Sequence, residues 1–291
     1  MFNIKQGFVR AAVATVSVVA LAFSAACGTT QSANNASDDK SADSSDITQQ
    51  TVTPGKLTIA TGEPAYEPWV MNDKPESGEG YEAAVAYDVA EKLGFKKSDV
   101  VWVRTTFDSA IAPGAKDWDM NIQQFGITDT RKKAVDFSSS YYNDSQAVIV
   151  KKDGKFANAK SLADLKDATI GVMVGTLAYD YVKKSIKEDI QTFNDDAALA
   201  QALDAGQIDA LVTSTVECVY MVQSEQVKNG VVLGRIAGSE DKNGMGIVLP
   251  KDSKLTAATT KAVDALKADG TLKQLQDKWL AEYTTDLTEL K

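Results

Sequence analysis

The chain has 291 residues, 44% of them hydrophobic and 24% charged, so it is long enough for about two domains with buried cores. Its 40 Asp and Glu outnumber 31 Lys and Arg, and the net charge of −9 argues against a nucleic-acid partner, because nucleic acids are bound by basic surfaces. The sequence has no histidine, which excludes His-based catalytic triads and zinc sites, and its two cysteines cannot form a disulfide framework. We expect no metal and no cofactor.

Residues 1–26 have the pattern of a secretory signal. Lys5 and Arg10 form a short basic start, and the apolar stretch Ala11–Ala22 follows. That stretch is too short for a lasting transmembrane helix. Removal of the two basic residues would change the net charge from −9 to −11, which suits an extracytoplasmic protein.

The end of this signal predicts a lipid anchor. The junction Ala25-Ala26-Cys27-Gly28 resembles a bacterial lipobox, whose cysteine becomes the lipidated N-terminus, although Ser24 stands where that pattern usually has Leu. Several acyl chains on Cys27 would attach the protein stably to the outer face of the cell membrane. The alternative is ordinary cleavage after a small residue, with no role for Cys27.

Residues 27–55 are predicted to form a flexible tether behind the anchor. Large apolar side chains are almost absent from this segment, so it buries too little surface to offset the entropy of ordering. Its four aspartates lack the glycine and terminal glutamate of a calcium loop, which favours a solvated tether over a cation site.

From Lys56 onward, patterns typical of strands and helices alternate, which predicts an α/β fold. The expected strands are Leu57–Ala60, Val100–Val103, Met120–Ile122, Gln146–Val150, Thr169–Met173 and Ile208–Val212. The expected helices are Glu82–Leu93, Thr176–Ile186, Ala197–Leu203, Val216–Val222, Leu255–Leu266 and Thr271–Tyr283.

Five sequence blocks, in order along the chain, resemble those of bacterial family 3 extracellular solute-binding proteins. Ala84 departs from the first block, where the family has Asp. Any single block is a weak signal, but five in the family's order over residues 56–284 are specific. The blocks are Gly80–Gly94, Phe125–Ser138 with Tyr141 and Tyr142, Ser161–Gly175, Ala202–Ala210 and Gly270–Trp279.

The resemblance implies a two-lobed, periplasmic-binding-protein-like II fold with two hinge crossings, near Asn143–Ser145 and near Asp241–Gly244. Residues 56–143 plus 245–291 would form the first lobe, and residues 146–240 the second. The implied function is the monomeric, extracytoplasmic substrate-binding subunit of an ABC importer. It would close its lobes on a small polar solute, an amino acid or related zwitterion, and present it to the membrane permease.

The resemblance also implies ligand contacts. Arg131 stands where the family's arginine grips the ligand carboxylate, which suits a planar guanidinium. Gly175 and Thr176 stand at a helix N-terminus that meets the same carboxylate. The aromatic positions are Tyr66, Trp69 and Phe107. Polar or small positions around the pocket are Glu63, Gln123, Gln124 and Gly126.

Ser214 is the largest departure from the family, since amino-acid binders usually have at its position the Asp that grips the α-ammonium group. Either Glu63 or Glu217 takes that role, or the ligand is not a standard α-amino acid. Cys218 lies among valines on a predicted helix and is expected to be a buried apolar residue.

Two other functions remain open at this point. A sensor module for a membrane receptor would use the same closure. A dehydratase-like enzyme on this fold is less favoured, because the sequence has no histidine and no recognisable nucleophile–base spacing.

Overall fold

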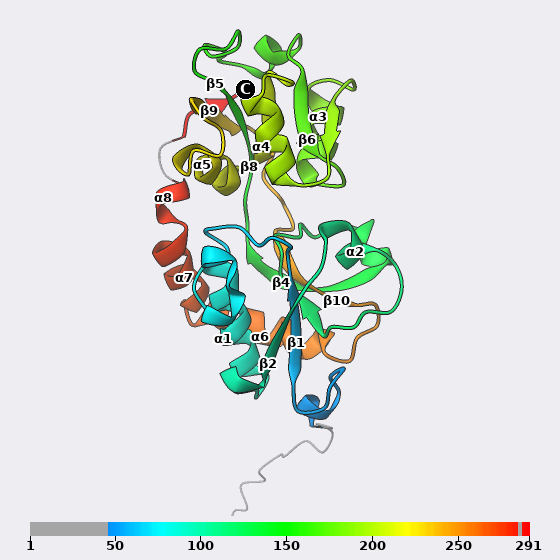
Figure 1. The fold of residues 1–291 in the computed structure, drawn as a ribbon. Coiled ribbons are helices and arrows are strands. Elements are labelled where there is room, and N and C mark those ends of the chain that lie inside the picture. Colours follow the sequence, from blue (N-terminus) through cyan, green and yellow to red (C-terminus); the bar gives the residue numbers. More distant parts are fainter. Residues whose placement is uncertain (1–45, 285–286) are drawn as a thin grey trace, which may run out of the picture. The chain divides into compact units, whose positions relative to one another are not determined.

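Two mixed β-sheets organise the protein, which is described here by a computed structural model covering residues 46–284 and 287–291. The first sheet has the strand order β2-β1-β3-β10-β4, and the second has the order β11-β9-β5-β8-β6-β7 (Figure 1). The first sheet contains β1 (Leu57–Thr61), β2 (Val100–Arg104), β3 (Met120–Asn121), β4 (Val135–Tyr142) and β10 (Met245–Pro250). The second contains β5 (Gln146–Lys151), β6 (Ile170–Met173), β7 (Gln191–Phe193), β8 (Ala210–Ser214), β9 (Gly230–Ile236) and β11 (Glu289–Leu290).

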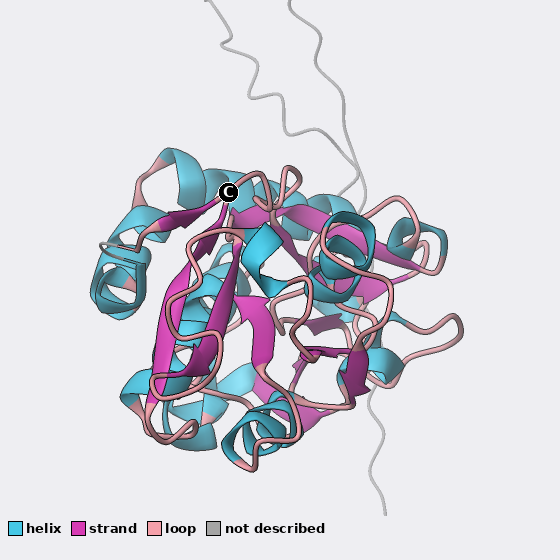
Figure 2. Cartoon of the chain, turned by 90° about the horizontal axis from the view of Figure 1, so that it is seen from above, coloured by secondary structure: helices cyan, strands magenta, loops and turns pink. Residues whose placement is uncertain are grey.

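Helices cover the strands of both sheets (Figure 2). They are α1 (Tyr81–Lys92), α2 (Phe107–Ile111), α3 (Leu177–Ser185), α4 (Asp196–Asp204), α5 (Thr215–Gln223), α6 (Thr256–Ala268), α7 (Thr271–Trp279) and α8 (Ala281–Thr284). None of the helices within the described ranges is both long and apolar enough to span a membrane. The two-lobed α/β fold predicted from the sequence is confirmed.

The alternation of side chains along β5 explains how the second sheet carries helices on both faces. Val148 shares a buried cluster with Val182 of α3, whereas its neighbour Ile149 packs with Leu199 of α4 and Met221 of α5. Successive side chains of a strand point to opposite faces, so a continuous apolar run marks a strand buried on both sides. The run in β5 therefore places α3 on one face and α4 with α5 on the other.

Two short segments connect the sheets and run beside each other. Residues 143–145 lead from β4 to β5, and residues 237–244 lead back from β9 to β10. The Asp241 backbone N–H donates to the Asp144 carbonyl at 2.9 Å, and the Asn143 side-chain amide donates to the Asp241 carbonyl at 3.2 Å. These hydrogen bonds hold the two connections together between the lobes.

The chain differs from the predicted lobe boundaries at its C-terminal end. Residues 245–291 were all expected in the first lobe, but β11 pairs in parallel with β9 in the second sheet. Gly234 makes this pairing possible, because a Cβ at that position would lie 2.4 Å from the Thr288 carbonyl oxygen. Instead, that oxygen accepts the Arg235 N–H at 2.8 Å. The close backbone approach was not predictable from local sequence patterns.

The predicted tether also ends earlier than residue 55. Thr51 is buried, and the carboxylate of the buried Asp119 accepts the backbone N–H groups of Val52 and Thr58, each at 2.7 Å. The segment from Asp46 to Gly55 is thus packed on the first lobe, with a short 3₁₀ helix at Ile47–Gln49. The predicted signal and the rest of the tether lie outside the described residues.

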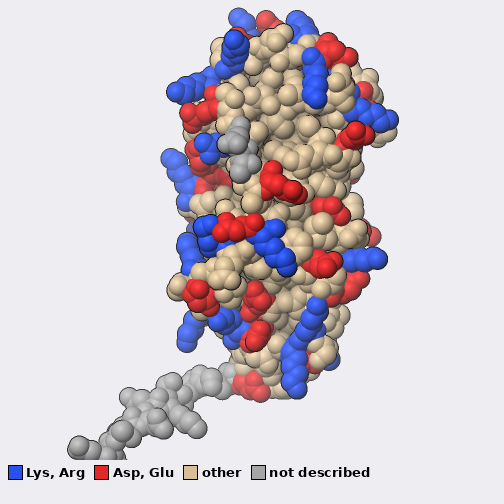
Figure 3. Space-filling model, turned by 90° about the vertical axis from the view of Figure 1, so that its left-hand side faces the viewer, with Lys and Arg blue, Asp and Glu red and all other residues tan. Residues whose placement is uncertain are grey.

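Side chains of both signs are interspersed over the face of the molecule drawn in Figure 3. The exposed ion pairs include Lys92 with Asp269 at 3.2 Å and Lys273 with Asp277 at 2.6 Å. Surface pairs of this kind contribute little to stability.

A buried carboxyl group in α1 fixes the chain that borders the space between the lobes. Glu82 is fully buried, and it accepts hydrogen bonds from the Tyr141 hydroxyl and from the side-chain amide of Gln124. It also accepts the backbone N–H of Gln124 at 2.8 Å, which holds that residue in a left-handed conformation with φ of 50°. Burial raises the pKa of Glu82 to about 7, and its three hydrogen bonds offset part of that rise.

This raised pKa predicts how stability changes with pH. Between pH 4.5 and about 7 the folded protein keeps a proton on Glu82 that the unfolded chain releases, so the free energy of unfolding falls as pH rises through this range. We expect Glu82→Gln to remove up to about 1.4 kcal/mol per pH unit of that slope. Urea denaturation of the ligand-free protein at several pH values measures it.

Glu79→Gln is the matched control, because Glu79 is an exposed glutamate near the start of the same helix. Its slope should equal that of the unsubstituted protein. Equal slopes for the protein and Glu82→Gln would contradict the assigned titration.

Candidate ligand-binding site

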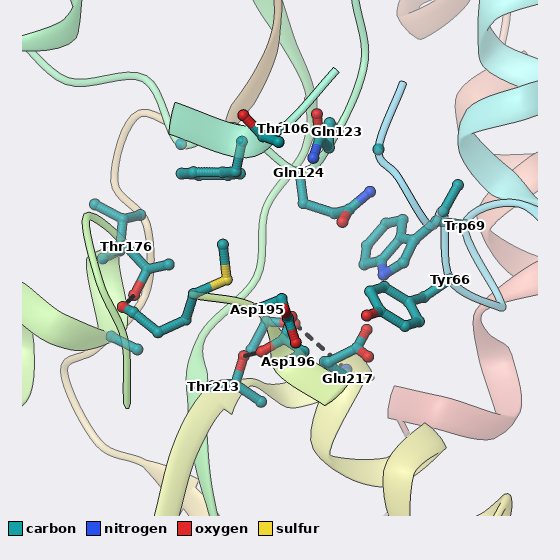
Figure 4. A pocket seen from close by; sticks show the side chains of 18 of the residues that line it. Tyr66, Trp69, Thr106, Gln123, Gln124, Thr176, Asp195, Asp196, Thr213 and Glu217 are labelled. Carbon is teal, nitrogen blue, oxygen red and sulfur yellow. Dashed lines mark hydrogen bonds between the residues drawn. The ribbon is translucent and has the colours of Figure 1, made fainter. Parts of the chain in front are cut away.

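A cavity of about 430 Å³ is lined by residues from both sheets. In each lobe, the lining residues follow the carboxyl ends of parallel strands, as expected for ligand sites of α/β sheets. The first lobe contributes residues after β1, β2 and β3, and the second contributes residues after β6, β7 and β8 (Figure 4). The topology thus gathers loops and helix starts that are far apart in the sequence.

Ten of the eleven predicted ligand-binding residues line this cavity. They are Glu63, Tyr66, Trp69, Phe107, Gln123, Gln124, Gly126, Arg131, Thr176 and Ser214. The eleventh, Gly175, lies beside the cavity and contacts Arg131 through its backbone carbonyl. Cys27, predicted to be lipidated, lies outside the described residues.

Arg131 links the backbones of the two lobes. Its side chain is buried, with one terminal nitrogen donating to the Gly126 carbonyl at 2.7 Å and the other to the Gly175 carbonyl at 2.8 Å. The guanidinium carbon lies 5.3 Å from the centre of the Phe107 ring, within range of a cation–π contact. Burial lowers the pKa of Arg131, and nearby aspartates oppose that shift. A guanidinium has five N–H donors, so three remain for a ligand.

Thr176 is the N-cap of α3 and directly follows Gly175, whose carbonyl accepts a hydrogen bond from Arg131. Its hydroxyl accepts the Tyr179 N–H at 3.2 Å and donates to the Met173 carbonyl at 2.8 Å. The hydroxyl is therefore occupied, and the free backbone N–H groups of the first helical turn are what α3 offers to an anion. Leu177 packs over Gly126, since a Cβ there would lie 2.5 Å from the leucine side chain.

Trp69 and Phe107 pack against core aromatic rings and also line the cavity. The Trp69 ring meets those of Tyr81 and Tyr142 edge to face, with centroid distances of 6.0 and 5.5 Å. Phe107 lies 4.5 Å from Phe125, centroid to centroid. Tyr66 and Trp69 each bury a polar atom, the hydroxyl and the indole N–H, that finds no hydrogen-bond partner among the described residues.

Three acidic side chains lie together where the second lobe meets Tyr66. Asp195 caps α4 and accepts the Ala198 N–H at 2.7 Å, Asp196 begins that helix, and Glu217 lies in the first turn of α5. The charges of all three raise the pKa of Tyr66, after burial as the larger cause. Figure 4 shows these acids near Tyr66 and Trp69, with Thr176 on the other side of the cavity.

Two of these acids, Asp196 and Glu217, hold their protons more tightly than an ordinary carboxyl group does. Burial raises the pKa of Asp196 to about 6, with the neighbouring Asp195 adding to the rise. Burial also raises the pKa of Glu217 well above its ordinary value, with further contributions from Asp196 and Asp144. The Trp69 side chain offsets part of this rise. Glu217 was a candidate from the sequence, whereas both aspartates were missed, because their only local signal is the start of a helix.

Ser214 and Glu63 take less central positions than these acids. The Ser214 hydroxyl caps α5 by accepting the Glu217 N–H at 3.3 Å. Glu63 lines the cavity but is exposed, whereas Glu217 is only 4% exposed and has one carboxylate oxygen without a hydrogen-bond partner in the described part of the chain. Cys218 is buried, as expected. In residues 46–284 and 287–291, no group of three or more Cys, Asp or Glu side chains is arranged to hold a metal ion.

The chain that forms this cavity is similar in sequence and structure to known amino-acid-binding proteins. The L-cystine-binding protein TcyJ of Escherichia coli (strain K12) is 29% identical over 232 residues, 78% of this chain and 84% of that protein. An L-arginine-binding protein of Pseudomonas aeruginosa is 28% identical over 227 residues, 75% of this chain and 86% of that protein. The solved structure of an ancestral arginine-binding protein bound to arginine superposes with a TM-score of 0.66 at 31% identity, covering 78% of this chain and 99% of that one.

The sequence profile of one family matches nearly the whole described part of the chain, residues 57–282. The match includes every residue that lines the cavity and every strand of both sheets except β11. The chain belongs to the bacterial extracellular solute-binding proteins, family 3.

Proposed function

We propose that this protein is the substrate-binding subunit of an ABC importer and that it captures a small amino acid outside the cytoplasmic membrane. The observation that carries the proposal is the buried Arg131 guanidinium in a cavity lined by both lobes. Its three uncommitted donors suit a carboxylate, which needs a fixed cation with matching hydrogen bonds once it leaves water. The cystine- and arginine-binding relatives support an amino acid as the ligand.

The carboxylate would lie between Arg131 and the first turn of α3. Arg131 approaches from the first lobe, and α3 belongs to the second lobe, so the ligand contacts both. A ligand with contacts to both lobes favours the closed arrangement by its differential affinity. The membrane permease would then recognise the closed form, and the protein would act as a monomer.

We propose that the ligand leaves the site unchanged. The hydroxyls of Thr176 and Ser214, which line the cavity, are engaged as helix caps. A nucleophile needs a general base to activate it, whereas the capping contacts of these two hydroxyls are to backbone groups. This arrangement supports binding and transport over catalysis.

We also propose that the protein is a lipoprotein. The lipobox-like junction at Cys27 would fix its N-terminus to the membrane, and residues 27–45 would serve as the tether to the folded part. Because Asp119 fixes the chain from Val52 onward, the tether is shorter than the sequence alone predicted.

The anchor proposal predicts that Cys27→Ser releases the protein from membranes or blocks its processing, because serine has no thiol to acylate. Fractionation of cells into membrane and soluble parts, followed by immunoblotting, measures the distribution. Cys218→Ser is the control, since Cys218 is buried in the fold and should leave the distribution unchanged. Unaltered membrane retention of Cys27→Ser would overturn the lipid anchor.

The carboxylate site predicts a strong effect of Arg131→Ala. The ligand for the test is the compound that stabilises the protein most in a thermal-shift screen of the L-amino acids and cystine. Loss of a buried charge partner typically costs about 2–5 kcal/mol, so affinity should fall by roughly 30-fold or more. Arg131→Lys keeps the charge but not the planar fork, and it should recover only part of the affinity. Isothermal calorimetry measures both variants.

Lys132→Ala is the matched control, because Lys132 is the next residue and its side chain is about half exposed. It should bind like the unsubstituted protein. If Arg131→Ala, shown by circular dichroism to be folded, binds with unchanged affinity, then the carboxylate does not bind at Arg131.

A further inference from the structure

We propose that the solute carries a positive charge remote from its carboxylate and that Glu217 with Asp196, flanked by Tyr66 and Trp69, binds this charge. The ligand class is therefore a basic amino acid with a side-chain ammonium or guanidinium group. This inference rests on the proposed function, since it uses the carboxylate position at Arg131.

The first support is the balance of charge around the cavity. Five carboxyl side chains line it against one guanidinium, that of Arg131. The acids are Glu63, Asp108, Asp195, Asp196 and Glu217. A ligand that adds one carboxylate and one ammonium leaves this imbalance unchanged. A ligand with an additional cation reduces it, and the low dielectric of a closed cavity strengthens that attraction.

The second support is an acceptor without a partner. Glu217 is only 4% exposed and lines the cavity, yet one of its carboxylate oxygens accepts no hydrogen bond within the described residues. The ion pairs found in that part of the chain do not include Asp195, Asp196 or Glu217. An unpaired buried carboxyl group is costly, and a bound cation removes that cost.

The third support is the surface that surrounds this oxygen. The rings of Tyr66 and Trp69 lie beside the acids in Figure 4, and aromatic faces attract ammonium and guanidinium groups. The aromatic faces also suit the methylene chain of a long basic side chain. The raised pKa values of Asp196 and Glu217 fit the same arrangement, because a bound cation would stabilise the charged form of each carboxyl group.

The location of the acid cluster in the cavity indicates that it binds a side-chain cation and not the α-ammonium group. Thr176 and the acid cluster lie on different sides of the cavity in Figure 4, and Arg131 contacts the loop that precedes Thr176. In an α-amino acid the carboxylate and the ammonium share one carbon atom. With the carboxylate at Arg131, the acid cluster is left for a group at the far end of the side chain.

The test compares three probes by calorimetry: L-lysine, L-norleucine, which has a methyl group in place of the ε-aminomethyl end, and 6-aminohexanoate, which lacks the α-ammonium. We expect the protein to bind L-lysine at least about 30-fold more tightly than L-norleucine, since a desolvated charge pair is lost with the ε-ammonium. We expect 6-aminohexanoate to bind more tightly than L-norleucine. Equal or tighter binding of L-norleucine would overturn the inference.

Two nearly isosteric variants locate the effect. Glu217→Gln and Asp196→Asn should each weaken L-lysine binding by about tenfold or more and change L-norleucine binding by less than about threefold. Glu188→Gln is the matched control, because Glu188 is an exposed acid of the same lobe that does not line the cavity. Unchanged L-lysine affinity in both folded site variants would place the cation elsewhere.

The outcomes also separate this inference from the proposed function. Tight binding of a neutral amino acid that depends on Arg131 but not on Glu217 or Asp196 would contradict the cation site and leave amino-acid binding intact. Loss of dependence on Arg131 for every amino acid that binds would contradict the proposed function itself. If Glu217→Gln fails to fold, the cation site is still tested by Asp196→Asn and by the three probes with the unsubstituted protein.

Discussion

The buried guanidinium of Arg131 is the contact on which the cavity depends. It extends from the first lobe and donates to backbone carbonyls of both lobes, at Gly126 and at Gly175. A fixed charge in this position needs compensation, and backbone carbonyls supply part of it. Gly126 has no side chain, which leaves room for the Leu177 side chain from the second lobe, and Gly175 has a left-handed backbone with φ of 73°. A ligand carboxylate would complete the compensation and add a bond between the lobes.

The rest of the site follows from how parallel strands end. The parallel strands of both sheets end, at their carboxyl ends, next to the cavity. Each lobe therefore lines the cavity with helix starts and loops rather than with strand edges. On the second lobe, the starts of α4 and α5 bring Asp196 and Glu217 together, and no described basic side chain pairs with them. The cavity thus has a cationic side at Arg131 and an acidic side at Glu217, which defines a direction for an elongated, charged ligand.

Local sequence patterns predicted elements with strong periodicity and missed those that depend on distant contacts. The apolar run Gln146–Val150 and the helix from Glu82 matched β5 and α1 to within a residue or two. Strand β4 was missed because three serines interrupt its apolar pattern. In the sheet, the Ser138 hydroxyl accepts the Ile247 backbone N–H at 2.9 Å, in place of a backbone carbonyl. The resemblance to the family pointed to Arg131, whereas Asp195 and Asp196 look like an ordinary helix start until α5 is packed beside them.

A crystal structure of the protein with L-lysine tests the central claim most directly, because it shows which end of the ligand each lobe holds. The account predicts the ligand carboxylate on the Arg131 guanidinium and the first turn of α3, with the ε-ammonium within hydrogen-bond distance of Glu217 and Asp196. A ligand bound with its carboxylate away from Arg131, or with its ε-ammonium directed to the exposed Glu63, would contradict it.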